Sequence, residues 1–274
     1  MMHDSPPDPA QVPAAARQTV GPSTVAGRSV WLDRTTAPRV VTLVLIAGLG
    51  ALNMNIFLPT LPAMAEYFQA DYALVQLAVS AYLGVTAVLQ LVIGPLSDRY
   101  GRRPVMLSGL AIFMLATVGC LLATNITTFL VFRMIQATVA TGIVLSRASV
   151  RDMVSADKAA SMIGYVTMGM AVVPMISPMF GGLLDELFGW RSTFWALFIL
   201  GGLTLWLAWA DLGETAVKSG KSLAGQFAEY PELLTSPRFW GYSLAAAFCS
   251  GAFFAYLGGG PFVGSVVFGL SPFW

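Results

Sequence analysis

The chain has 274 residues, of which 56% are hydrophobic and only 11% are charged, and its mean hydropathy is +0.71. Soluble domains typically carry about 25% charged residues, so this composition predicts an integral membrane protein. The net charge of +1 gives no sign of a nucleic-acid partner, and the only histidine, His3, argues against a histidine metal site. Cys120 and Cys249 lie in apolar runs, where we interpret them as small hydrophobes rather than a disulfide framework.

The chain begins with a polar tail and continues as a series of apolar segments. Residues 1–38 are rich in Pro, Ala, Ser and Thr without an apolar period, which predicts a disordered tail. Segments of about 20 residues follow, each long enough to cross a hydrocarbon core about 30 Å thick. They predict an all-α polytopic membrane protein with spans at 40–60, 74–95, 105–123, 127–149, 160–183, 192–211 and 239–258.

One longer polar stretch separates the sixth predicted span from the seventh and is the best domain boundary in the chain. It divides the sequence into a cytoplasmic tail at 1–38, a six-helix unit at 39–211, a cytoplasmic linker at 212–238, and a last part at 239–274. We interpret that last part as a seventh helix and the start of an incomplete second half.

The distribution of Lys and Arg predicts a cytoplasmic N-terminus, because cytoplasmic loops carry an excess of these residues. In that orientation Arg191 lies outside, Arg133 lies within a helix, and the other 13 of the 15 basic residues lie inside. The inside set is Arg17, Arg28, Arg34, Arg39, Arg99, Arg102, Arg103, Arg147, Arg151, Lys158, Lys218, Lys221 and Arg238.

The stretch "GPLSDRYGRRPVML" at 94–107 places four charges between two apolar segments and predicts a cytoplasmic turn. Glycine permits a tight turn and close helix approach, and a carboxylate beside several arginines accepts charge-assisted hydrogen bonds. Such a cluster could hold helix ends together in one state and release them in another. The alternative is the ordinary arginine excess of inner loops. The candidate gate residues are Gly94, Asp98, Arg99, Gly101, Arg102 and Arg103.

A second stretch, "GGLLDELFGWR" at 181–191, has the same order as "GPLSDRYGRR": Gly, x, Leu, x, Asp, and then Gly before a basic residue. The two stretches lie three predicted spans apart, so they would face opposite sides of the membrane. An inverted repeat of three helices plus three would produce this pattern. Chance similarity is the alternative for so short a match.

These stretches resemble the major facilitator superfamily, because "GPLSDRYGRRPVML" is similar to the loop signature of that superfamily. Further stretches resemble its drug:proton antiporter branch, of the bicyclomycin/chloramphenicol resistance type: "NIFLPTLPAMAEYF" at 55–68, "FRMIQATVATGIVLSRASVRD" at 132–152, and "VVPMISPMFGGLLDELFGWRSTFW" at 172–195. The resemblance implies two six-helix halves that work by alternating access. It also implies export of small amphipathic drug-like compounds through a bacterial inner membrane, with a proton gradient as the energy source and no cofactor or enzymatic activity.

The sequence departs from the branch at Asn55, where its members usually carry an acid. An amide does not exchange a proton at neutral pH, and no Asp or Glu falls in the interior of a predicted span. Proton pumps normally need an intramembrane titratable group. We therefore expect any coupling group in a loop or outside this chain. We also expect that the chain, which stops where the family would enter an eighth helix, is a partial product that inserts without transporting alone and could self-associate.

Polar side chains within the predicted spans are candidates for a substrate cavity, because unsatisfied polar groups are costly in lipid. The alternatives are ordinary interhelical hydrogen bonding for the amides and snorkelling to the outer interface for Arg133. Arg133 matches the fourth-helix arginine of the family, and Gln136 lies on the same helical face. The candidate set is Asn53, Asn55, Gln76, Tyr82, Gln90, Arg133 and Gln136.

The fifth predicted span contains a small-residue and proline pattern that permits kinking and close packing. By resemblance to the antiporter branch, its residues Pro174, Pro178, Gly181 and Gly182 would control leakage and direction. The rival to a transporter is a membrane protein that binds or regulates without transporting, which the missing acid and the short length favour. No catalytic constellation in the sequence supports an intramembrane enzyme.

Overall fold

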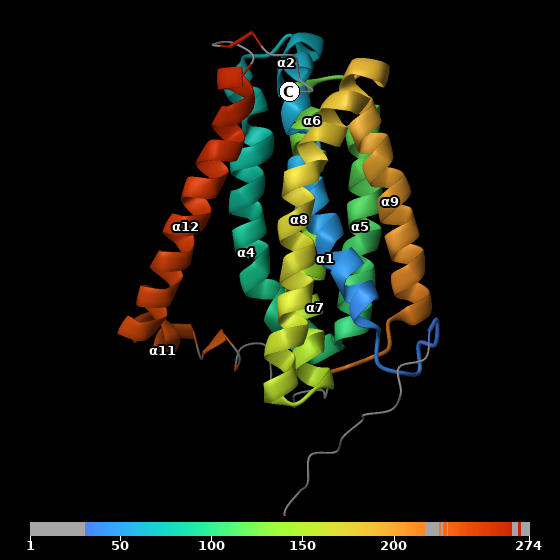
Figure 1. Cartoon of the computed structure of the whole chain (residues 1–274), viewed down its shortest axis with the longest axis vertical. Helices are drawn as coiled ribbons and strands as arrows, with labels where there is room; N and C mark the ends of the chain where they lie inside the picture. The colour runs from blue at the N-terminus through green and yellow to red at the C-terminus, as the bar shows by residue number, and fades with distance from the viewer. Residues whose placement is uncertain (1–30, 217–224, 226, 229, 265–267, 270–274) are drawn as a thin grey trace, which may run out of the picture.

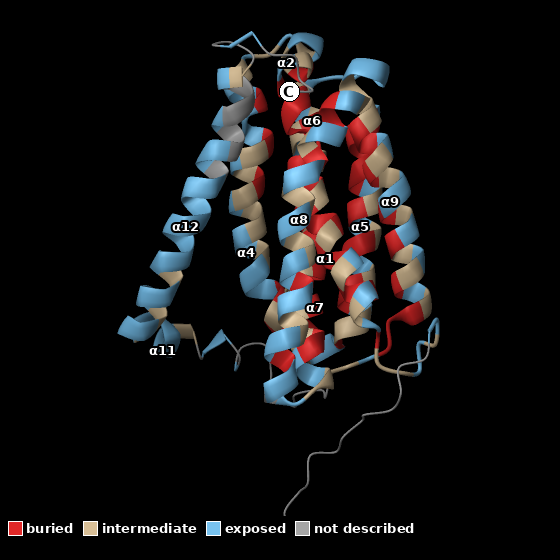
Figure 2. Ribbon diagram, viewed as in Figure 1, coloured by how far each residue is buried: buried red, intermediate tan, exposed pale blue. Residues whose placement is uncertain are grey.

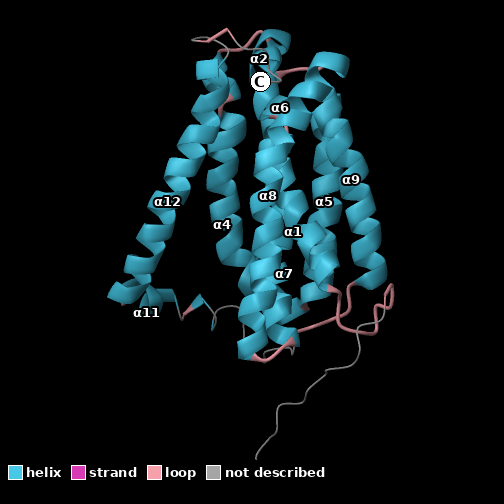
Figure 3. Cartoon of the chain, viewed as in Figure 1, coloured by secondary structure: helices cyan, strands magenta, loops and turns pink. Residues whose placement is uncertain are grey.

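The computed structural model describes residues 31–216, 225, 227–228, 230–264 and 268–269, which form an elongated helical bundle (Figure 1). The described residues contain no strand (Figure 3). Most of the predicted tail, together with Lys218 and Lys221 of the predicted linker, lies outside the described residues. The predicted all-α polytopic class is confirmed.

Six helical stretches are long and apolar enough to cross a membrane, and they coincide with the first six predicted spans. They are built from α1 (Val40–Asn55) with η3 (Leu58–Thr60) and α2 (Leu61–Phe68), α3 (Tyr72–Val75) with α4 (Leu77–Tyr100), α5 (Arg102–Leu122), α6 (Ile126–Ile135) with η4 (Gln136–Val139) and α7 (Ala140–Met153), α8 (Ala156–Phe188), and α9 (Arg191–Asp211). After the short α11 (Tyr230–Thr235), α12 (Pro237–Phe262) covers the predicted seventh span.

The core of the bundle surrounds α1, which packs against α7, α8 and α9. Figure 2 shows buried residues concentrated on α1 and its neighbours, whereas α12 is largely exposed. The α1–α8 contact is close because glycines accept neighbouring groups: a Cβ on Gly169 would contact Val44, and one on Gly181 would collide with the carbonyl oxygen of Ile56. Both pairs are 125 residues apart in sequence, so α1 and α8 run parallel.

The two similar glycine stretches form the same kind of helix junction at opposite ends of the bundle (Figure 1). Gly101 between α4 and α5 has φ of 103°, and Gly189 between α8 and α9 has φ of 78°. Each glycine N–H donates a 2.8 Å hydrogen bond back into the preceding helix, to Ser97 and Asp185 respectively. Positive φ favours glycine in both places. The matching junctions agree with the 3+3 inverted repeat inferred from the sequence.

Two details of the predicted boundaries need correction. The gate stretch is almost entirely helical, because α4 continues to Tyr100 and only Gly101 breaks the chain. Gly94 therefore lies inside α4 and forms no turn. No neighbouring atom lies within 4 Å of a Cβ placed on Gly94. Pro95 lies within α4 but does not end that helix.

The last part of the predicted tail, 31–38, lies against the end of α9. The buried carboxylate of Asp211 at the end of α9 accepts hydrogen bonds from the N–H groups of Leu32 at 3.1 Å and Arg39 at 3.2 Å, and from the Thr42 hydroxyl at 2.5 Å. Composition favoured disorder here, but one buried carboxylate supplies the acceptors that these N–H groups need. The segment is thereby held against the end of α9.

Candidate functional site

Arg133 lies at the centre of a buried polar cluster and is 0% exposed. Its Nε donates to the Ala78 carbonyl at 3.2 Å, and its Nη2 donates to the Asn53 carbonyl at 2.9 Å. Its Nη1 donates to Asn53 Oδ1 at 2.8 Å and to Gln136 Oε1 at 2.7 Å. The side chain therefore points into the bundle, and it does not reach toward the membrane surface.

Neighbouring side chains complete the cluster around Arg133. The Phe57 and Tyr82 rings lie 4.2 Å and 4.3 Å from the guanidinium carbon. Asn53 Nδ2 donates to the Tyr82 hydroxyl at 3.0 Å, and Gln136 Nε2 donates to Thr117 Oγ1 at 2.8 Å. Ring faces and neutral acceptors stabilise the buried cation without a carboxylate. The cluster joins α1, α4, α5 and the α6–η4 segment.

The remaining candidate cavity residues do not join this cluster. Asn55 is buried and its Nδ2 donates to the Ala51 carbonyl at 2.6 Å, while its Oδ1 has no hydrogen-bond partner. Gln76 and Gln90 are both exposed. Gln76 lines a separate cavity of about 420 Å³ between α4 and α12, whose wall includes Ala255.

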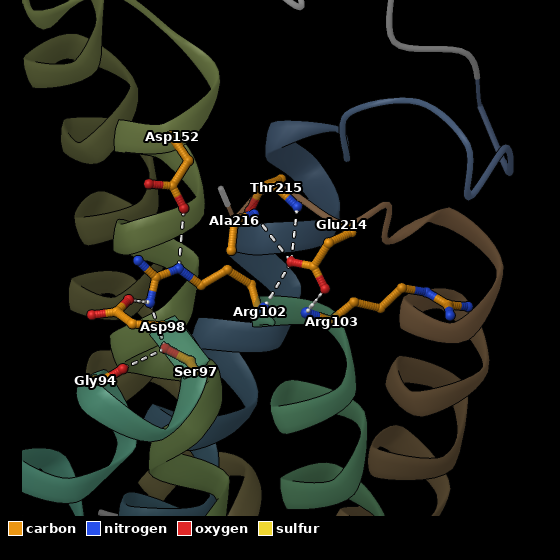
Figure 4. Close-up of polar contacts among 9 residues, drawn as sticks. All are labelled: Gly94, Ser97, Asp98, Arg102, Arg103, Asp152, Glu214, Thr215 and Ala216. Carbon is orange, nitrogen blue, oxygen red and sulfur yellow. Dashed lines mark hydrogen bonds and ion pairs between the residues drawn. The ribbon is translucent and has the colours of Figure 1, made fainter. Parts of the chain in front are cut away.

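A second polar network lies at the end of the bundle where α4 meets α5 (Figure 4). The Arg102 guanidinium lies between two carboxylates, with Nη1 2.5 Å from Asp98 and Nε 3.0 Å from Asp152 of α7. Its Nη1 also donates to the Ser97 hydroxyl. The side chains of Arg102, Asp98 and Asp152 are 13%, 38% and 26% exposed. One guanidinium thus joins α4, α5 and α7 where water can compete.

The carboxylate of Glu214 supports this network from the segment after α9. It accepts hydrogen bonds from the N–H of Arg102 at 2.8 Å and from the N–H of Arg103 at 3.3 Å. An acid at a helix N-terminus satisfies free N–H groups and complements the helix dipole. The Arg103 guanidinium points away from the network (Figure 4) and donates to the Leu212 carbonyl at 2.7 Å. Sequence spacing could not reveal Glu214, because it is more than one hundred residues from its partners.

Arg99 and Tyr230 also lie at this end of the bundle. Arg99 is exposed, and its guanidinium lies 5.4 Å from the Tyr100 ring centre, so it stands apart from the ion pairs. Tyr230 of α11 donates a 2.6 Å hydrogen bond to the Leu91 carbonyl of α4. Burial, and then the Asp98 carboxylate, raise the pKa of the Tyr230 hydroxyl above its ordinary value.

The candidate residues of the fifth span lie on one continuous helix. Pro174 and Pro178 are both inside α8 and partly buried, and α8 runs unbroken past them. Gly182 is buried beside Gly181, which permits the approach of α8 to the end of α1. Ser177, only 3% exposed, has a hydroxyl without a hydrogen-bond partner. Gly181 thus packs closely against the end of α1, and a role of this stretch in leakage or direction stays a prediction.

Among the described residues, no group of three or more His, Cys, Asp and Glu side chains could hold a metal ion. The fold and the two networks describe a polytopic helical membrane protein with a fixed polar centre and a charged junction at one end. The same fold occurs in a bacterial homologue of the human lysosomal transporter Spinster, in an inward-facing and unoccupied conformation. The two are 23% identical with a TM-score of 0.69, over 85% of this chain and 56% of that one.

The chain belongs to the major facilitator superfamily, whose family model matches residues 43–274. It is 36% identical to the MFS-type transporter YdgK of Bacillus subtilis, over 83% of this chain and 58% of that protein. It is 33% identical to the chloramphenicol resistance protein of Pseudomonas aeruginosa, over 76% of this chain and 50% of that protein. It is 34% identical to multidrug resistance protein D of Escherichia coli, over 62% of this chain and 43% of that protein.

These relatives confirm the resemblance to the drug-resistance branch that the sequence indicated. The chain spans about half the length of these relatives. Superfamily membership also agrees with the expectation that the chain is not an enzyme.

Proposed function

We propose that this protein works as a secondary transporter of the bacterial inner membrane that exports small amphipathic compounds by alternating access. Superfamily membership and relatives named for chloramphenicol and multidrug resistance support this proposal. The partners are then the drug-like substrate and the lipid bilayer.

One observation carries the mechanism: the Arg102 network joins three helix ends through charges that water can reach. Exposed ion pairs contribute only about 0–1 kcal/mol, because water competes for both charges. A gate has to close and reopen in every cycle, so weak, water-accessible pairs suit it better than buried ones. We propose that this network holds one face closed and that its release accompanies opening.

An ion gradient is the proposed energy source, and proton antiport is the form that the relatives favour. The acids in the described helices lie near helix ends, as with Asp98, Asp152 and Asp185, whereas Asn55 is an amide. A proton carrier other than Asn55 is therefore required. If Asn55→Asp is made, the new carboxyl should add a pH dependence to transport. Unchanged transport across a wide pH range would reduce Asn55 to a structural role.

A second candidate function is a membrane protein that binds the same compounds without moving them. The neutral side chain at Asn55 favours it, because it removes the usual intramembrane titratable group. Reconstitution of a full-length version, in which the 274-residue chain is continued by a second half, into liposomes with an imposed gradient and a panel of cationic and neutral drugs separates the two. The 274-residue chain alone is expected to show no efflux. Saturable, gradient-driven efflux supports export, whereas saturable binding with no efflux supports the binding function. The Arg102→Ala variant in the same liposomes is the matched control and should lose efflux.

The proposed topology places the N-terminus and the α4–α5 junction in the cytoplasm. The six-helix unit at 39–211 and the part at 239–274 are then joined by a cytoplasmic linker at 212–238. Single cysteines at Tyr100, Asn125, Phe188 and Lys221 in a Cys-free version test it with an impermeant thiol reagent. Labelling of position 221 from outside intact cells contradicts the topology.

Self-association is a further part of the proposal. Large apolar side chains are exposed on two helices, with Val88 of α4 63% exposed and Met175 of α8 80% exposed. Both helices are among the spans, so lipid covers these faces unless a second copy does. Light scattering of the purified chain should then report a mass above one protomer, and a strictly monomeric chain argues against it.

A further inference from the structure

Arg133 has little capacity left to bind a substrate. Four hydrogen bonds to Ala78, Asn53 and Gln136 occupy its guanidinium, and two aromatic rings cover its faces. A guanidinium has five N–H donors in total. A ligand that needed Arg133 would first have to displace these buried partners. A substrate anion would therefore need another cation within the spanning helices.

Arg147 of α7 is such a cation, and its guanidinium is poorly satisfied. Its Nε is buried without a hydrogen-bond partner, and its Nη2 has the Met170 sulfur of α8 at 3.8 Å. Thioether sulfur is a weak acceptor. Neither ion pair among the described residues includes Arg147, since both belong to Arg102.

The Arg147 side chain is directed into the bundle. Arg147 lies six residues before the end of α7, about 9 Å along the helix at 1.5 Å per residue. Met170 lies fourteen residues after the start of α8, about 21 Å from the same α7–α8 junction. Contact with Met170 thus requires the guanidinium to point away from the junction. A snorkelling arginine would point toward it.

Apolar side chains lie near Arg147 in the fold. Val144, one turn earlier on α7, and Met170 are partly buried hydrophobic residues packed against the core. Arg147 itself is partly exposed, although its Nε is buried. An unpaired charge within a spanning helix is costly and commonly marks a ligand or ion pathway.

We propose that Arg147 binds the anionic group of an amphipathic organic acid, such as an aromatic carboxylate, while Val144 and Met170 contact its apolar part. A planar carboxylate matches the guanidinium fork and accepts two charge-assisted hydrogen bonds. The inference rests on the proposed export function and names a substrate class for it.

Binding to a matched pair of probes tests the inference without requiring transport. The purified chain in phosphatidylcholine nanodiscs is titrated with naphthalene-2-carboxylate and with naphthalene-2-carboxamide at neutral pH. The two share one apolar body and differ in charge. We expect the carboxylate to bind at least tenfold more tightly than the amide. In Arg147→Gln the carboxylate should lose that advantage, and amide binding should stay unchanged.

Arg151→Gln is the matched control, because Arg151 is an exposed arginine one turn later on the same helix. It should keep the carboxylate preference. Thermal unfolding separates binding from a structural role: removal of an unpaired cation should leave the melting temperature of Arg147→Gln equal or higher. Equal affinity for the two probes, binding of neither, or a preference retained in Arg147→Gln overturns the inference. These outcomes leave the export proposal standing, since export is measured independently as efflux.

Discussion

Two arginines hold this bundle together in different ways. Arg133 is 0% exposed and its hydrogen-bond partners are carbonyl and amide oxygens, whereas the Arg102 side chain is 13% exposed and its partners include two carboxylates. Arg133 joins parts of the chain at the buried centre, and Arg102 joins helix ends beside water.

The difference follows from the environment of each cation. In the interior, oriented dipoles and ring faces stabilise Arg133 only when all of them are in place, so the arrangement resists change. At the helix ends, Asp98 and Asp152 compensate the charge of Arg102, and water can replace either partner at small cost. We therefore expect the central cluster to determine stability and the outer network to determine switching.

The largest effect on stability is expected from Arg133→Ala. The change leaves Asn53 Oδ1 and Gln136 Oε1 without their donor, and buried polar atoms left unsatisfied cost about 1–3 kcal/mol each. We expect the free energy of unfolding to fall by about 3 kcal/mol and transport to be lost. Unfolding of the purified chain in detergent, monitored by circular dichroism, measures the first quantity.

Arg133→Lys is the matched variant for this prediction. An ammonium keeps the charge but lacks the planar fork that reaches Ala78, Asn53 and Gln136 together. It should recover part of the stability and not restore transport fully. Wild-type stability and export in Arg133→Ala would show that the cluster is dispensable.

The extent to which sequence predicted these arrangements depends on the distance along the chain. Apolar segments predicted the spans, and the i, i+3 spacing predicted that Arg133 and Gln136 share a face. The same reasoning could not pair Arg133 with Asn53 or Arg102 with Glu214, because those contacts depend on how helices pack. It missed the orientation of Arg147, which was counted only as an inner-loop cation, and it missed the contacts between the tail and Asp211.

The next effect concerns the junction that positions Arg102. Gly101→Ala places a Cβ in an extended positive-φ conformation that is essentially restricted to glycine, which costs about 1–3 kcal/mol, and that Cβ would also collide with the Glu214 carboxylate. Gly189→Ala carries the same backbone cost, but nothing lies within 4 Å of its Cβ. We expect a loss of stability of about 1–3 kcal/mol at Gly189 and a larger loss at Gly101. Parallel melting curves measure both, and equal losses would mean that Glu214 does not constrain the junction.

A smaller effect on stability but a clear effect on function is expected at Asp98. Asp98→Asn removes one charge from a carboxylate that is 38% exposed, so stability should change by less than about 1 kcal/mol. Under the proposed gate, transport should fall at least tenfold, because a weakened network would no longer hold one face closed. Efflux from liposomes that carry the full-length version measures this, with expression and melting temperature as controls. Normal efflux in both Asp98→Asn and Arg102→Ala would refute the gate.

The smallest effect is a salt dependence that distinguishes the two arginines directly. Mobile ions screen charges that are in contact with water, with a Debye length of about 10 Å at 0.1 M and about 3 Å at 1 M, and they hardly reach buried groups. The stabilisation by Arg102 should therefore decrease as sodium chloride rises from 0.1 M to 1 M, by less than about 1 kcal/mol. The stabilisation by Arg133 should stay constant, because its partners are neutral and enclosed. The quantity to measure is the melting-temperature difference between the wild type and each alanine variant at both salt concentrations. A salt-dependent difference for Arg133→Ala would mean that water and ions reach the central cluster, and the distinction between a fixed centre and a switching rim would then fail.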